Sequence, residues 1–166
     1  MNRMKLIIAV LLSLPLASLA QDCKLKKGQD DISSKPTLST GFLALQDLSL
    51  SMDANSREID LFFVMNNTAA KCFDEESSIT VTYEGGKTKT ELKGSGSLNC
   101  DGLYHVIFKN SAYTPSNLQK LATKKVINIK VVSANNKITN INLTPEQQTE
   151  LMNNAACIAK EAKTIL

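Results

Sequence analysis

The single histidine of the chain, His105, is the first place to look for catalytic chemistry. Nucleophilic catalysis by serine or cysteine needs a base, and histidine most often fills that role. His105 stands between Tyr104 and Val106 in an alternating stretch, which is more typical of a strand position than of a catalyst. A hydrolase site here would need carboxylates, and Asp74 and Asp101 are the candidates because each follows closely on a cysteine. The chain has no G-x-S-x-G, P-loop, H-E-x-x-H or G-x-G-x-x-G motif.

The cysteines offer a second kind of chemistry, because a cysteine can ligate a metal or form a disulfide. They are Cys23, Cys72, Cys100 and Cys157. No two of them have the short gap of a zinc knuckle, and His105 is the one imidazole that could complete a metal site. We therefore predict two disulfides and no metal or cofactor site. Spacing alone leaves three pairings open.

Carboxylates gather at Asp30–Asp31 and at residues 74–76. Neither group has the alternating oxygen-ligand spacing of a calcium loop, so solvated loop charge is the favoured interpretation. A glycosidase pair can come from distant strands, but sugar clefts usually offer aromatic platforms. The chain has no tryptophan and only three scattered tyrosines. The sequence thus disfavours both a glycosidase and a sugar-binding module.

The first residues have the pattern of a cleavable secretory signal peptide. Arg3 and Lys5 precede an apolar run, which is uninterrupted over Leu6–Leu12. The small residues of Ser18-Leu19-Ala20 suit cleavage before Gln21, and the run is shorter than the ~20 residues that span a bilayer. We expect an exported protein, periplasmic or extracellular, with no transmembrane segment after the signal is removed.

Charge and composition limit the partners of the mature chain. Loss of Arg3 and Lys5 takes the net charge from +3 to +1, so no nucleic-acid partner is expected. The expected organisation is a signal peptide at 1–20, an extended N-terminal segment at 21–40 stapled to the rest, and a β-rich domain with a C-terminal helix at 41–166.

From residue 41 onward the apolar residues mostly alternate, which predicts strands. Gly85–Gly86 marks a hairpin turn, and a change of parity at Gln46–Asp47 indicates a β-bulge. The stretch Glu58–Asn66 is apolar on both sides and is expected to be a central strand covered on both faces. We predict a mainly β (α+β) fold, an antiparallel sheet or sandwich of about seven strands, at roughly 42–52, 58–66, 78–84, 87–93, 103–108, 126–132 and 137–143.

Two helices are expected, a short one after Thr114–Pro115 and a C-terminal one packed on the sheet. Thr144, Pro145 and Gln147 form a helix start with a capping box. Cys157 points away from the apolar stripe of this helix, so something other than the sheet must cover it. The polar N-terminal segment lacks apolar docking residues, which favours Cys23 with Cys157 and Cys72 with Cys100.

Three stretches carry a resemblance to a known group of proteins: Asp30–Lys35, Leu121–Val126, and Thr144–Gln148 ahead of the cysteine-bearing helix. In these the mature chain resembles small exported proteins of uncharacterised function from Bacteroidota. The resemblance implies export and a similar fold, and it implies no activity and no site residues.

Two functional hypotheses follow. The first is a non-enzymatic binding or interaction module that presents a sheet face or edge to a protein, peptide or apolar ligand, with Phe62, Phe63 and Val64 as the apolar strand content that suggests it. The alternative is a hydrolase with its site near His105, Asp101 and Asp74.

Overall fold

The computed structural model describes residues 23–31, 33–66, 71–95 and 98–166. The expected signal peptide, residues 1–20, lies outside the described residues. No helix in the described ranges is both long and apolar enough to cross a membrane.

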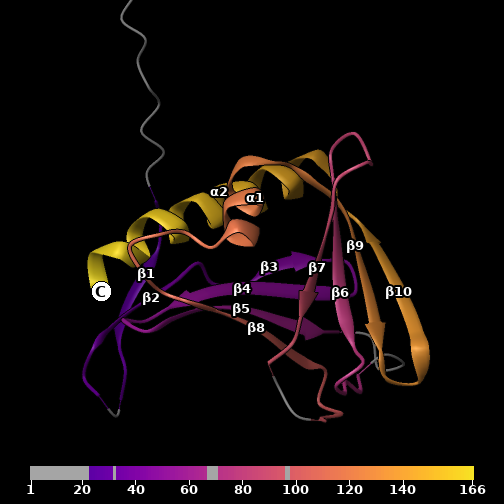
Figure 1. Cartoon of the computed structure of the whole chain (residues 1–166), viewed down its shortest axis with the longest axis horizontal. Helices are drawn as coiled ribbons and strands as arrows, with labels where there is room; N and C mark the ends of the chain where they lie inside the picture. The colour runs from indigo at the N-terminus through magenta and orange to yellow at the C-terminus, as the bar shows by residue number, and fades with distance from the viewer. Residues whose placement is uncertain (1–22, 32, 67–70, 96–97) are drawn as a thin grey trace, which may run out of the picture.

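The described residues form two antiparallel sheets and two α-helices, which confirms the mainly β class and the C-terminal helix packed on sheet (Figure 1). The six-stranded sheet, here the large sheet, has the order β1-β2-β4-β5-β8, with β3 also paired to β4. Its strands are β1 (Lys26–Gln29), β2 (Pro36–Ser39), β3 (Leu43–Leu45), β4 (Leu48–Ala54), β5 (Glu58–Met65) and β8 (Leu103–Lys109). The small sheet has the order β10-β9-β6-β7. Its strands are β6 (Ser78–Tyr83), β7 (Lys89–Lys93), β9 (Val126–Ser133) and β10 (Lys137–Asn142), and the short η2 (Ala134–Asn136) joins the last two.

The helices lie along one side of both sheets, and the strands of the small sheet run across those of the large one (Figure 1). They are α1 (Ser116–Thr123) and α2 (Pro145–Glu161), which continues as η3 (Ala162–Ile165). Helix α2 contacts α1 and strands of both sheets, and its inward residues are fully buried in one core with the inner faces of those sheets. The capping box at Thr144 and Gln147 is present.

Two buried polar side chains tie the layers together. The hydroxyl of Tyr104 on β8 accepts a hydrogen bond from the amide of Gly94 at 2.5 Å. It also donates toward the carbonyls of Ser77 and Leu92, at 3.0 and 3.2 Å, and so links the large sheet to β6 and β7. The Asn110 amide donates to the carbonyls of Asn55 and Ala162, both at 2.8 Å, and thereby fastens the end of α2 to the β4–β5 turn.

Two local expectations were wrong. Gln46 and Asp47 form a tight turn between β3 and β4 and not a bulge within one strand. A two-residue turn changes parity just as a bulge does, because Leu45 and Leu48 then face each other across the ladder on the same buried side. Strand β5 is not covered on both faces, since its residues alternate strictly between buried and half-buried.

Ten strands are present in the described residues where about seven were expected. One reason is the split of the first expected strand into β3 and β4. The other is that the N-terminal segment forms the β1–β2 hairpin, which joins the large sheet through the pairs Leu38–Ala54 and Ser39–Asp53. Two disulfides are present, Cys23–Cys157 and Cys72–Cys100. This is the pairing that the sequence favours.

Candidate functional site

The outer face of the large sheet, turned away from the helices and the core, carries a row of three rings. We call Phe42, Phe62 and His105 the aromatic row. Phe62 on β5 lies directly opposite His105 on β8, because the ladder pairs these two residues. Their rings stack with centroids 4.4 Å apart and planes 15° apart, and the ring of Phe42 follows at 5.9 Å from that of Phe62. The row therefore crosses the strands.

The alternation of β5 explains why the row is open to solvent. Its odd-numbered residues point into the core, and Phe63 is 1% exposed. Phe62 and Val64 point outward and are half-buried. Of the three residues that suggested a binding face, Phe63 thus belongs to the core and the other two to the outer face. Phe42 is 61% exposed, and Ile107 next to His105 on the same face of β8 is 43% exposed.

A hydrogen-bonded acid–base pair lies beside the row. The Nδ1 atom of His105 is 2.6 Å from Oδ2 of Asp60, its neighbour on β5. The other carboxylate oxygen, Oδ1 of Asp60, is buried and has no hydrogen-bond partner among the described residues. Asp53 on β4 lies opposite Asp60 in the ladder, and Glu58 is two residues away on the same face of β5. The face is therefore acidic on one side of the aromatic row, with Lys109 opposite Glu58 as its basic residue.

Burial raises the pKa of the Asp60 carboxyl above its ordinary value of 3.8. The hydrogen bond and charge of His105 lower this pKa, while Asp53 and Glu58 raise it further. Because the pKa is higher in the folded state, ionisation of Asp60 costs folding stability as the pH rises from the unfolded value through the folded one, and costs nothing below both. A cation held near this group of carboxylates would offset that cost.

The carboxylates predicted for a hydrolase are not the ones that His105 contacts. Asp74 and His105 do line one pocket of about 250 Å³ beside β8, together with Ser77, but Asp101 is not part of its wall. Within it the Asp74 carboxylate accepts a hydrogen bond from the Ser77 hydroxyl at 2.7 Å, not from His105. The partner of His105 is Asp60, 45 residues earlier in the chain. Alternation alone could have placed both on one face, but their pairing depends on which strands are neighbours.

The described residues contain no group of three or more His, Cys, Asp or Glu side chains arranged to hold a metal ion. Two pockets flank the N-terminal hairpin, with volumes of about 670 Å³ and 470 Å³. The larger lies between the segment around Thr40–Phe42 and the exposed side of α2, so Phe42 belongs both to the wall of this pocket and to the aromatic row.

Comparisons with known proteins give no relative for this architecture. No family model matches the chain, and neither a curated protein nor a solved structure is similar to it.

Proposed function

We propose that this protein is an exported, disulfide-stabilised binding module that holds a basic, apolar peptide segment of a partner protein on the outer face of its large sheet. The observation that carries the proposal is the aromatic row, a contiguous line of rings that is open to solvent. Most large apolar side chains of the described residues are buried, so such a line is unusual in this protein. Contiguous exposed apolar surface of this kind marks interaction sites.

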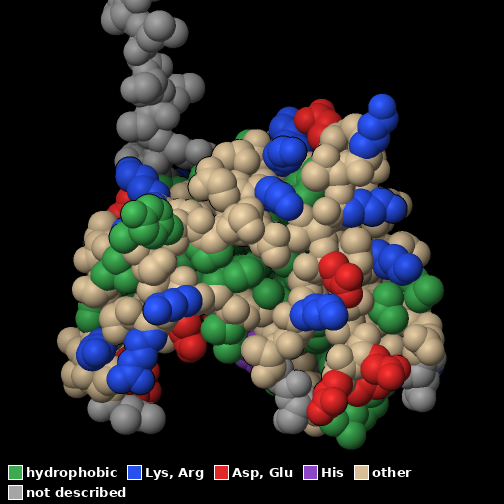
Figure 2. Space-filling view, viewed as in Figure 1, with side chains coloured by type: hydrophobic (Ala, Val, Ile, Leu, Met, Phe, Trp, Pro, Cys, Tyr) green, Lys and Arg blue, Asp and Glu red, His purple; other side chains and the backbone are tan. Residues whose placement is uncertain are grey.

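Charge on the same face indicates which peptides fit. Asp53, Glu58 and Asp60 lie on one side of the row and line one surface pocket of about 310 Å³. A lysine or arginine of the partner would supply the positive charge that pairs with this acidic group. The rings of Phe42 and Phe62 would pack against the partner's apolar side chains. The lower side of the molecule is hollowed below the large sheet, between the β1–β2 hairpin and the loops at the far end of the small sheet (Figure 2).

Binding is tested with two short synthetic peptides, one alternating lysine with phenylalanine and one alternating glutamate with phenylalanine. We expect the lysine peptide to bind more tightly, and the double variant Phe42→Ala/Phe62→Ala to weaken that binding roughly tenfold or more, because buried aromatic contacts dominate interface energetics. Titration calorimetry measures both affinities.

Ile138→Ala is the matched control, since Ile138 is a 56% exposed aliphatic side chain on β10 of the other sheet. It should leave the affinity unchanged. Equal binding of the two peptides would contradict the charge assignment. Unaltered binding by the phenylalanine double variant would remove the aromatic row from the site.

Export is supported by the expected signal peptide and by the two disulfides, which persist in oxidising compartments. When the full chain is expressed with its own leader, the protein recovered outside the cytoplasm should begin at Gln21, in part cyclised to pyroglutamate. Intact-mass measurement distinguishes this product from one that retains Met1, and recovery of the latter alone would refute export by this leader.

A further inference from the structure

A second surface, at the opposite end of the small sheet from the Cys72–Cys100 loops, is rich in lysine. We call it the lysine crest, and it consists of Lys87, Lys89, Lys120, Lys124 and Lys125. The first two belong to the β6–β7 hairpin and the other three to the end of α1 and the entry to β9. Lys and Arg side chains gather over this part of the molecule in the space-filling view (Figure 2).

Backbone contacts bring the two halves of the lysine crest together. The amide of Glu84 in the hairpin donates to the carbonyl of Lys125 at 2.9 Å, and the amide of Lys124 donates to the carbonyl of Lys120, also at 2.9 Å. A hollow of about 530 Å³ lies between the hairpin turn and the end of α1, with Glu84, Lys124, Lys125 and Met152 in its wall. The two halves of the crest therefore lie next to each other, on either side of this hollow.

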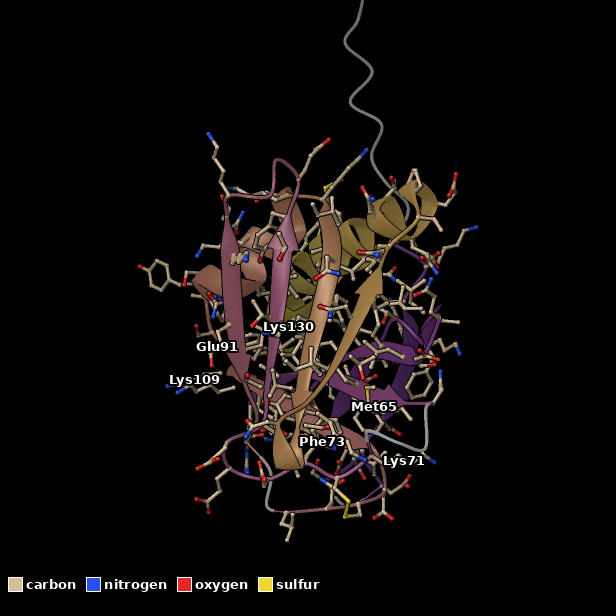
Figure 3. The ribbon with its side chains drawn as sticks, turned by 90° about the vertical axis from the view of Figure 1, so that its right-hand side faces the viewer. Met65, Lys71, Phe73, Glu91, Lys109 and Lys130 are labelled. Carbon is tan, nitrogen blue, oxygen red and sulfur yellow. A yellow bond between two sulfur atoms is a disulfide. The ribbon has the colours of Figure 1, made fainter. Side chains whose placement is uncertain are left out.

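The positive charge of the crest exceeds the negative charge beside it. Five lysines stand against two nearby carboxylates, Glu84 in the hairpin turn and Glu91, which is two residues after Lys89 on the exposed face of β7. No crest lysine forms an ion pair with a carboxylate of the described residues. On the small-sheet face below the crest the charge is mixed, because Glu91 and Lys130 lie on either side of Thr80 in the ladder (Figure 3).

The crest projects outward. Gly85 and Gly86 at the turn have positive φ angles, 83° and 71°, and a side chain added at either would meet nothing within 4 Å. The turn stands beyond the ends of the strands in both ribbon views (Figures 1 and 3). A projecting tip can place several lysines on a flat surface at once.

We infer that the lysine crest docks the protein on an anionic phospholipid surface, with lipid phosphates as the groups recognised. Each lysine close to such a surface adds attraction that decays within a Debye length of about 8 Å at physiological ionic strength. The long aliphatic stems of the lysines and the Met152 side chain can approach the headgroup layer. This inference is independent of the aromatic row, which lies on the other sheet.

The test is sedimentation of the folded, oxidised protein with vesicles of phosphatidylglycerol and phosphatidylcholine, compared with vesicles of phosphatidylcholine alone. We expect binding to the first and not to the second, with release at high salt. The double variant Lys87→Glu/Lys124→Glu should bind the anionic vesicles at least roughly tenfold more weakly, because each lysine that is replaced removes part of the attraction to the lipid phosphates. Both side chains are exposed, so the fold should survive, and thermal unfolding verifies this.

Lys26→Glu/Lys27→Glu on β1 is the matched control, because it makes the same change in net charge at another exposed site. It should bind vesicles nearly as well as the unmodified protein. Equal loss in both double variants would overturn the inference, since binding would then follow net charge alone. Absence of binding to the anionic vesicles would overturn it as well, and so would full displacement by inorganic phosphate at matched ionic strength or a clear preference for DNA over the vesicles.

Discussion

The double variant Cys23→Ser/Cys157→Ser is expected to lower the free energy of unfolding by about 2–5 kcal/mol. The bond joins residues 134 positions apart, the larger of the two disulfide loops, and so removes the most entropy from the unfolded chain. The β1–β2 hairpin is held to β4 by only two residue pairs, at Leu38 and Ser39. Local opening of this hairpin should therefore precede global unfolding.

Limited trypsin digestion separates local from global effects. In the variant, cleavage should become faster after the lysines of the N-terminal segment, Lys24 to Lys35, while the fragment from β4 onward stays folded. The Cys72→Ser/Cys100→Ser variant is the control, because it also removes a disulfide but leaves the hairpin fastened. Equal trypsin sensitivity of both variants would show that the Cys23–Cys157 bond does not hold the hairpin.

Tyr104→Phe should destabilise the fold by about 1–3 kcal/mol, although it deletes a single oxygen atom. The Gly94 amide and the carbonyls of Ser77 and Leu92 would lose their partner in a site that is 4% exposed. Hydrogen exchange at the Gly94 amide should accelerate, and denaturant titration gives the change in the free energy of unfolding.

Tyr83→Phe serves as its control. Tyr83 is also buried, at 1% exposure, but its hydroxyl makes no well-formed hydrogen bond among the described residues, and the Thr90 hydroxyl is the side chain that interacts with it. Removing it should be nearly neutral or stabilising. A Tyr104→Phe variant as stable as the unmodified protein would mean that the link between the sheets depends on ring packing and not on the hydroxyl.

Local chemistry made several elements predictable from the sequence. The start of α2 follows from Thr144, Pro145 and Gln147 because a capping box satisfies backbone groups through neighbours in the chain. The β6–β7 hairpin follows from alternation around Gly85–Gly86, which both adopt positive φ. Each of these depends on residues only a few positions apart.

The N-terminal hairpin shows the opposite case. The β1 sequence Lys26–Gln29 has no apolar alternation, and all four residues are exposed. Its strand character comes from pairing with β2, which is itself placed by Leu38 in the core and by the disulfide from Cys23. The amino acids of β1 alone therefore do not predict a strand, because its causes are contacts with residues far away in the chain.

The candidate site depended even more on long-range pairing. The sequence draws attention to His105 because it is the one histidine. Its partner Asp60 lies on a strand whose neighbours the sequence does not specify. Phe62 and Phe63 are adjacent and chemically identical, and only the register of β5 decides which one enters the core. A face can be proposed from alternation, whereas the contacts across it require the sheet order.

The Cys23–Cys157 bond also has a mechanical meaning. It closes the chain from the first described residue to the last turns of α2 into a covalent ring that contains every strand of both sheets. A pulling force that enters at the N-terminal end and leaves at the C-terminal end would pass through the sulfur–sulfur bond and the helical tail after Cys157, and would bypass the chain between the two cysteines. Both sheets would remain unstretched under tension, so a partner held on the large sheet could be pulled by the chain ends without the binding face being unravelled.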